Sequence, residues 1–283
     1  ADLVDEYRIS QGFTDASSSI NKLRNEIYED VIEKVCHLDL NQKIYSLNVP
    51  TGSGKTLTSV SFALKLRGRI TDETGLSPRI IYCLPFMSII DQNYDVISSV
   101  FSSSFGSEIP SDILLKHHHL SDFRYSPSDE EIYDEDASRL LIEGWNSEFI
   151  ITTFVQFFHT IISNKNRAIR KFHTIANAIV ILDEVQSIPH HYWLLIHDII
   201  KTLALCLNVR IIFVTATQPL IFDESISVEI VELATKKSTY FSRLDRVNLI
   251  FNKEYLLIPD FIIQMQDRIR NEPEKDFLIV LNT

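Results

Sequence analysis

Residues 44–56 read IYSLNVPTGSGKT, an apolar run that leads into a glycine-rich loop and then into a helix-forming segment. Glycine lets the backbone curl around a polyphosphate, so we expect the loop amides to point at phosphate oxygens. Lys55 can then reach the β and γ phosphates, and the Thr56 hydroxyl can bind Mg²⁺. The predicted contacts of this nucleoside triphosphate site are Thr51, Gly52, Ser53, Gly54, Lys55 and Thr56.

One position departs from the strict phosphate-loop pattern. The pattern G-x-x-x-x-G-K-[ST] has glycine where Val49 stands in this chain. When this segment is judged by itself, the alternative to a nucleotide site is a Gly/Ser-rich turn that contains a lysine by chance.

Length and composition are typical of a globular protein: 283 residues, of which 45% are hydrophobic. The formal net charge of −11 argues against a generally basic nucleic-acid surface, although a local groove can still be positive. Cys36, Cys83 and Cys206 lie in apolar surroundings, which predicts reduced core thiols rather than a disulfide framework. No apolar stretch reaches the roughly 18 residues of a membrane span, and the N-terminus lacks a signal pattern. We therefore expect a cytoplasmic protein with no membrane partner.

Short β-branched runs alternate with longer amphipathic segments along the chain, a pattern that predicts a parallel sheet flanked by helices. Most of the runs are almost wholly apolar, as strands covered on both faces should be. The expected strands are residues 44–49, 79–84, 112–116, 149–153, 178–182, 210–215 and 277–281. The expected helices are residues 57–66, 89–100, 132–143, 154–163, 192–206 and 259–270. The predicted fold class is α/β, with a mostly parallel sheet and helices on both faces.

Two carboxylates, Asp183 and Glu184, follow the apolar run of residues 178–182. A strand end beside a phosphate loop is where Mg²⁺ chemistry is expected in such a fold. Asp183 would hold the metal through water, because Mg²⁺ keeps much of its hydration shell and prefers one or two carboxylates. Glu184 would orient and deprotonate the attacking water. Acidic residues at strand ends are also common helix caps, but together with the phosphate loop this pair is predicted to be catalytic.

A third element, Thr215-Ala216-Thr217, ends the strand predicted at residues 210–215. Small hydroxyl side chains there can hydrogen-bond to the strand that carries the carboxylates and so sense the state of the γ-phosphate. The tripeptide is weak evidence alone. The order of phosphate loop, acidic pair and Thr-Ala-Thr, however, resembles motifs I, II and III of superfamily 2 helicases.

The resemblance is most specific around the acidic pair. Asp183-Glu184-Val185-Gln186 resembles the DExD/H box, and residues 181–189 with Tyr192-Trp193 resemble the helicase part of the CRISPR-associated helicase-nuclease of type I systems. Further matches are residues 82–86, 89–92, 152–156 and 243–247. The similarity covers most of residues 40–250 and implies a RecA-like phosphate-loop domain.

What this resemblance implies is an ATP- and Mg²⁺-dependent motor that moves along single-stranded DNA. A relative of this kind is recruited by an RNA-guided CRISPR surveillance complex and works with a nuclease domain or subunit. The resemblance places catalysis on Lys55, Asp183 and Glu184, the metal on Thr56 and Asp183, and coupling on Gln186, Thr215 and Thr217. Gln186 stands where many relatives have aspartate or histidine, so a neutral hydrogen bond would replace an ionic link. Strand-end residues suited to contact a DNA backbone are Pro85, Phe86, Gln92, Thr152, Thr153 and Gln156.

We expect three parts in the chain. Residues 1–40 form a helical lead-in, residues 41–250 the first RecA-like motor domain, and residues 251–283 a linker helix and the first strand of a truncated second RecA-like domain. Because the second domain would supply arginines for phosphoryl transfer, the isolated chain is expected to bind ATP but to hydrolyse it slowly. His197-Asp198 has the spacing of an ordinary helix, so nuclease activity is expected to be absent. A general superfamily 2 DNA or RNA helicase, and a nucleotide-gated scaffold without enzymatic activity, are the open alternatives.

Overall fold

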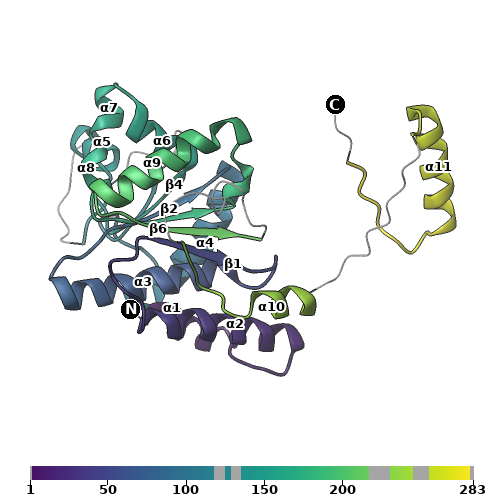
Figure 1. Cartoon of the computed structure of the whole chain (residues 1–283), viewed down its shortest axis with the longest axis horizontal. Coiled ribbons are helices and arrows are strands. Elements are labelled where there is room, and N and C mark those ends of the chain that lie inside the picture. Colours follow the sequence, from purple (N-terminus) through teal and green to yellow (C-terminus); the bar gives the residue numbers. More distant parts are fainter. Residues whose placement is uncertain (1, 118–124, 129–134, 217–229, 245–254, 281–283) are drawn as a thin grey trace. The chain divides into compact units, whose positions relative to one another are not determined.

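The computed structural model describes residues 2–117, 125–128, 135–216, 230–244 and 255–280. The chain divides into two compact units, residues 1–244 and 245–283. In the described part of the larger unit, parallel strands form one seven-stranded sheet in the order β3-β4-β2-β5-β6-β1-β7 (Figure 1). The strands are β1 (Ile44–Asn48), β2 (Ile80–Leu84), β3 (Leu114–His117), β4 (Phe149–Thr153), β5 (Ile179–Asp183), β6 (Arg210–Thr215) and β7 (Ile230–Glu232).

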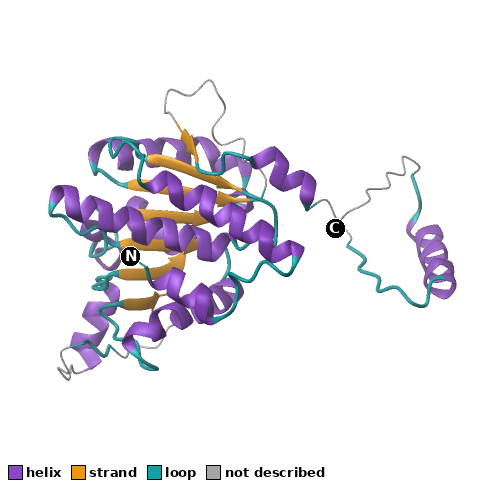
Figure 2. Cartoon of the chain, turned by 90° about the horizontal axis from the view of Figure 1, so that it is seen from below, coloured by secondary structure: helices purple, strands orange, loops and turns teal. Residues whose placement is uncertain are grey.

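Helices cover both faces of this sheet (Figures 1 and 2). Because successive strand side chains point to opposite faces, Tyr45 joins one apolar core and its neighbour Ile44 the other. The first core is closed by α1 (Leu3–Ser10), α2 (Ser19–Val35), α3 (Lys55–Thr74), α4 (Met87–Phe105) and α10 (Lys237–Arg243). The second is closed by α5 (Glu135–Glu143), α6 (Phe154–Ile162), α8 (Phe172–Ile175) and α9 (Trp193–Cys206), with the short α7 (Asn166–Ile169) beside them. The predicted α/β fold with helices on both faces is confirmed.

Most of the predicted strands are confirmed, with ends that differ by one or two residues. The prediction for residues 277–281 is wrong over its described part, because residues 277–280 have no regular secondary structure. A strand is defined by its ladder of hydrogen bonds, and an apolar run does not form one without a neighbouring strand. The sequence pattern also missed β7, a three-residue edge strand whose residues are all only half-buried.

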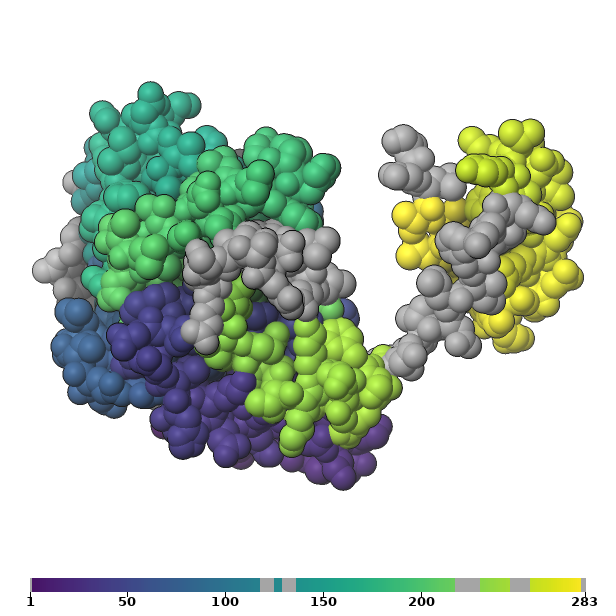
Figure 3. All heavy atoms as spheres, viewed as in Figure 1, coloured from purple at the N-terminus to yellow at the C-terminus, as the bar shows by residue number. Residues whose placement is uncertain are grey.

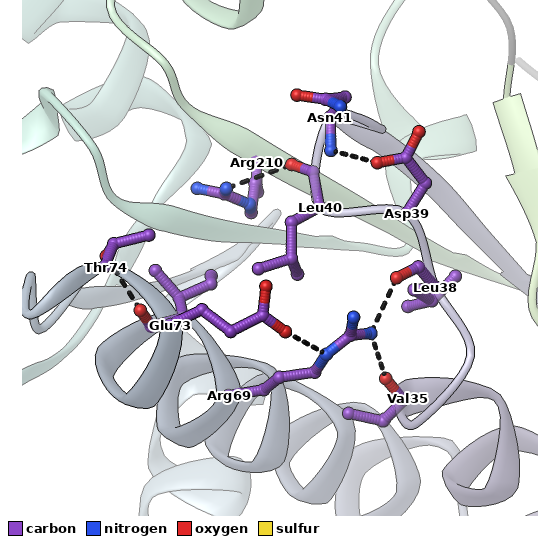
Figure 4. Close-up of polar contacts among 10 residues, drawn as sticks. Val35, Leu38, Asp39, Leu40, Asn41, Arg69, Glu73, Thr74 and Arg210 are labelled. Carbon is purple, nitrogen blue, oxygen red and sulfur yellow. Dashed lines mark hydrogen bonds and ion pairs between the residues drawn. The ribbon is translucent and has the colours of Figure 1, made fainter.

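The connection from α2 to β1 is held by two arginines (Figure 4). Arg69, on α3, donates to the carbonyl oxygens of Val35 and Leu38 at 2.7 and 2.6 Å, and so satisfies the carboxyl end of α2. Arg210, the first residue of β6, donates to the Leu40 carbonyl at 3.1 Å. These bonds fix the chain that leads into β1, and β1 carries the phosphate loop.

The segment of β7 and α10 lies against the amino-terminal helices, as Figure 3 shows. The Asp30 carboxylate on α2 accepts hydrogen bonds from the backbone amide of Thr235 at 2.8 Å and from the Tyr240 hydroxyl at 2.9 Å. Arg243 pairs with Glu26 on the same helix. The first helices of the chain and the end of the larger unit therefore pack as one body.

The prediction that all three cysteines lie in the core is wrong for two of them. Cys83, on β2, is buried as expected, but Cys36 and Cys206 are exposed. Both exposed cysteines stand at helix carboxyl ends, where one side of the residue faces solvent even in an apolar stretch. Within the described ranges, no helix is both long and apolar enough to cross a membrane.

The smaller unit contains α11 (Ile258–Asn271) among its described residues. Pro259 lies in the first turn, where the missing amide hydrogen costs nothing, and Arg268 and Arg270 lie in the last turn. The helix predicted at residues 259–270 is confirmed.

Candidate functional site

The glycine-rich loop connects β1 to α3 at the carboxyl edge of the sheet. Gly52 and Gly54 have φ values of 81° and 87°, in the left-handed region that glycine adopts without strain. Gly54 is the N-cap of α3, so the free amides of the first helical turn lie beside the loop. Val49, at the departure from the strict pattern, packs in the core and donates its amide hydrogen to the Thr215 carbonyl at 3.2 Å. The valine therefore anchors the loop to β6 rather than disturbing it.

The predicted loop contacts differ in exposure. Thr51 and Gly52 lie at the exposed tip, whereas Ser53 is buried and its hydroxyl has no hydrogen-bond partner in the described part of the chain. Lys55 and Thr56 begin α3 and are half-buried. An anion bound in the loop would meet backbone amides, a lysine and hydroxyl groups from this one segment.

The acidic pair lies next to the loop. β5 ends with Asp183 in the middle of the sheet, between β2 and β6. The Lys55 ammonium contacts the Glu184 carboxylate, with 2.9 Å between Nζ and Oε1. Glu184 itself has φ 57° and ψ 42°, a left-handed conformation that is uncommon for a residue with a side chain. Strained backbone of this kind is concentrated at functional sites, and here it turns the carboxylate toward the loop lysine.

Asp183 is almost completely buried, with 5% of its surface exposed. Its Oδ2 accepts a hydrogen bond from the Tyr82 hydroxyl at 2.7 Å, whereas its Oδ1 has no partner among the described residues. Burial raises the pKa of Asp183 to about 6, and the nearby charge of Glu184 adds to the effect, while the Tyr82 hydrogen bond and the Lys55 charge oppose it. Burial, with the charge of Asp183, raises the pKa of Tyr82 well above its ordinary value, so the phenol keeps its proton and can donate.

The residues predicted to bind Mg²⁺ fit such an ion. The buried Oδ1 of Asp183 is a hard oxygen ligand that the described protein leaves unsatisfied, which is costly unless a cation or water meets it. Thr56 donates its hydroxyl hydrogen to Asn93 Oδ1 at 3.0 Å, which leaves the oxygen lone pairs of Thr56 for a metal. Mg²⁺ prefers a small number of such oxygens and completes its shell with water.

A chain of side-chain contacts joins the end of β6 to the loop lysine. Thr215 donates to Gln186 Oε1 at 2.8 Å, and the Gln186 amide donates to Glu184, which contacts Lys55. The predicted coupling residues Gln186 and Thr215 are therefore connected by hydrogen bonds to Glu184 and Lys55, two of the residues predicted to be catalytic. Thr217, the third predicted coupling residue, lies outside the described residues.

The residues predicted to contact nucleic acid occupy different environments. Pro85, Phe86 and Gln92 follow β2, and Phe86 and Gln92 are exposed. Thr152 is completely buried in β4, and Thr153 caps α6 by accepting the Gln156 amide hydrogen at 3.1 Å. These nucleic-acid roles remain predictions, and only the first group offers exposed side chains.

Two hollows beside the site were not predicted. An apolar groove of about 620 Å³ follows the ends of β2, β4 and β5, where Phe86, Phe158 and Tyr192 contribute to its walls. A second pocket, of about 270 Å³, opens beside Gly54 and is lined by Phe13, in the turn between α1 and α2, and by residues of both these helices. The walls of each hollow combine segments that are far apart in the sequence, so no local pattern reveals the hollows themselves.

Comparison with known proteins agrees with this geometry. The profile of the DEAD/DEAH box helicase family matches residues 25–224. The CRISPR-associated nuclease/helicase Cas3 of Haloferax volcanii is 34% identical over 182 residues, which cover 62% of this chain and 19% of that protein. The chain thus spans about a fifth of the length of this curated relative.

Solved structures show the same fold. The crystal structure of T. fusca Cas3 aligns with 94% of this chain and 34% of that chain, at a TM-score of 0.60 and 14% identity. The structure of T. fusca Cas3-ATP aligns with 82% of this chain and 28% of that chain, at a TM-score of 0.53 and 18% identity. The all-parallel sheet, the phosphate loop and the acidic pair thus stand in a chain that belongs to the DEAD/DEAH box helicase family.

Proposed function

We propose that residues 41–250 form an ATP-binding motor domain that hydrolyses ATP with Mg²⁺. The observation that carries the proposal is that Lys55, Glu184 and Asp183 meet at one edge of the sheet, where Asp183 Oδ1 has no partner among the described residues. These groups come from segments far apart in the sequence and supply a phosphate ligand, a base and a metal ligand.

In this proposal, Lys55 exchanges one anionic partner for another. In the structure the Lys55 ammonium is balanced by the Glu184 carboxylate, with 2.9 Å between Nζ and Oε1. A bound triphosphate would draw the ammonium to its β and γ oxygens and release the carboxylate. Glu184 could then orient a water molecule and accept its proton.

Asp183 and Thr56 would hold Mg²⁺, which supplies positive charge to the phosphate oxygens when it is bound. Gln186, through its contacts to Glu184 and Thr215, would couple the state of the carboxylate to β6. The nucleotide base would enter the pocket beside Gly54, because that pocket is open next to the loop and has aromatic walls.

We further propose that the motor acts on single-stranded DNA in CRISPR type I interference, together with an RNA-guided surveillance complex and a nuclease domain or subunit. The 34% identity to a CRISPR-associated nuclease/helicase supports this assignment. A cytoplasmic location is part of the same proposal.

Nucleotide binding and turnover test the proposal separately. We expect a fluorescent ATP analogue to bind the wild type, and Lys55→Ala to weaken binding about 10-fold or more through the loss of charge-assisted hydrogen bonds. Lys65→Ala is the matched control, since Lys65 lies on the same helix but pairs with Asp2 and Asp5 at its surface. Equal affinities of the wild type and Lys55→Ala would contradict the proposed site.

Turnover with single-stranded DNA, duplex DNA and RNA distinguishes the alternatives. We expect these 283 residues to hydrolyse ATP slowly when they are assayed by themselves. Stimulation by RNA rather than DNA would favour a general helicase. Tight binding with no stimulation by any nucleic acid would favour a scaffold. Co-purification of the protein with a surveillance complex tests the CRISPR assignment.

A further inference from the structure

Two side chains outside the phosphate loop and the acidic pair hold the two predicted metal ligands. The Tyr82 hydroxyl donates to Asp183 Oδ2 at 2.7 Å, in surroundings where both residues are buried. Asn93 Oδ1 accepts the Thr56 hydroxyl hydrogen at 3.0 Å. Tyr82 is on β2 and Asn93 is on α4, the helix that directly follows it, so one strand-helix unit contacts both ligands.

Tyr82 determines which oxygen of Asp183 is available. A carboxylate can rotate about its terminal bond, and either oxygen could then face the loop. The hydrogen bond from Tyr82 occupies Oδ2 and leaves Oδ1 without a partner in the described chain. β5 pairs with β2 in parallel, with Tyr82 opposite Ile181, so the phenol is fixed by the sheet itself.

Asn93 determines the direction of the Thr56 hydroxyl hydrogen. A hydroxyl has one hydrogen and two lone pairs, and only the lone pairs can face a cation. The Asn93 amide is itself oriented, because its Nδ2 donates to the Ile89 carbonyl at 2.9 Å on the same helix. Its oxygen is therefore turned toward Thr56 and accepts the hydroxyl hydrogen, which leaves the Thr56 lone pairs for a cation.

We infer that Tyr82 and Asn93 are positioning residues for the divalent cation, Tyr82 through Asp183 and Asn93 through Thr56. The inference rests on the proposed ATP and Mg²⁺ site and adds to it the residues that orient its ligands. Partners of this kind, one shell outside a metal, fix ligand orientation and contribute to metal affinity.

The test measures cation affinity without turnover. Mn²⁺ replaces Mg²⁺ as a paramagnetic probe, and its binding to the full chain in the presence of ADP is followed by electron paramagnetic resonance. We expect Tyr82→Phe and Asn93→Ala each to weaken Mn²⁺ binding by about 10-fold or more. The affinity for fluorescent ADP in EDTA should stay at the wild-type value, because neither side chain belongs to the predicted phosphate contacts.

Tyr45→Phe is the matched control. Tyr45 is another buried tyrosine of the sheet, on β1, and its hydroxyl donates to the Gln42 carbonyl at 2.7 Å rather than to a metal ligand. We expect this variant to keep the wild-type affinities for both Mn²⁺ and ADP.

The outcomes separate this inference from the proposed function. Wild-type Mn²⁺ affinity in both variants, while Asp183→Asn abolishes Mn²⁺ binding, would overturn the inference and leave the proposed site intact. Absence of Mn²⁺ and nucleotide binding in the wild type would overturn both. Equal losses of Mn²⁺ and metal-free ADP affinity would indicate a structural role and also overturn the inference. If Tyr82→Phe does not fold, the Mn²⁺ affinity of Asn93→Ala alone tests the inference, because Asn93 is only half-buried.

Discussion

Asp183→Asn is expected to stabilise the metal-free protein at neutral pH, because it removes a charge that burial disfavours. The carboxyl ionises near its ordinary pKa of 3.8 in the unfolded chain, whereas burial raises the pKa to about 6 in the fold. At roughly 1.36 kcal/mol per pKa unit, this difference corresponds to about 3 kcal/mol in the free energy of unfolding. An asparagine at this position can still accept the Tyr82 hydrogen bond.

The effect depends on pH with a definite sign. Below pH 3.8 the carboxyl is protonated in both the folded and the unfolded state, and its contribution to stability is fully present. As pH rises through about 6, the folded protein must ionise a buried group, and that contribution is lost. The gain from Asp183→Asn should therefore be small near pH 4 and approach its full value above about pH 7.

Urea unfolding in EDTA, at about pH 4.5 and about pH 7.5, measures this gain. Asp30→Asn is the matched control with the opposite expectation. Burial raises the pKa of Asp30, but hydrogen bonds from Thr235 and Tyr240 outweigh burial and lower it overall. Its replacement should destabilise the protein by about the same amount at both pH values, because both lie above the ordinary pKa of 3.8, where the contribution of a lowered carboxyl pKa is present. A loss of stability in Asp183→Asn at pH 7.5, or the same change at both values, would refute the argument from burial.

Three further predictions concern coupling, packing and thiol exposure. Gln186→Ala breaks the contacts to Thr215 and Glu184, so we expect slower ATP turnover with unchanged nucleotide affinity; a change in affinity alone would contradict the coupling role. Leu182→Ala should lower the free energy of unfolding by about 2–5 kcal/mol because Leu182 is completely buried. The control is Leu194→Ala, at a residue that is 79% exposed, which should change the free energy of unfolding by less than about 0.5 kcal/mol. Urea unfolding measures both variants. A thiol reagent should modify two cysteines of the native protein quickly and Cys83 only after unfolding.

The sequence was sufficient for the parts of the fold that local patterns encode. Apolar β-branched runs predicted most strands, and their continuous hydrophobicity predicted a sheet covered on both faces. Lys55 and Glu184 could be predicted to meet because parallel strands bring their carboxyl ends to one edge of the sheet. The short edge strand β7 escaped prediction because three half-buried residues carry no periodic signal.

Contacts set by three-dimensional packing could not be predicted. Tyr82 belonged to a predicted strand and to the match at residues 82–86, but its hydrogen bond to Asp183 depends on β2 pairing with β5. Asn93 lies in a helix whose pattern is governed by its apolar face, so nothing local indicates the contact to Thr56. The exposure of Cys36 likewise depends on where α2 ends and on which side of it meets the core.

The position of β1 in the sheet has a consequence for the synthesis of the protein. β1 precedes the other described strands in the chain, but within the described residues it pairs with β6 and β7, the last two, so Ile44 lies beside Ile211 and Ile230. Contacts between residues so far apart in the sequence form slowly, because a long loop must be closed first. While the chain is still growing, the edges of β1 and its face in the second core are uncovered and open to chaperones or to aggregation. The phosphate loop directly follows β1 and is positioned by it. Nucleotide binding should therefore develop late in folding, once β1 has paired with β6 and β7.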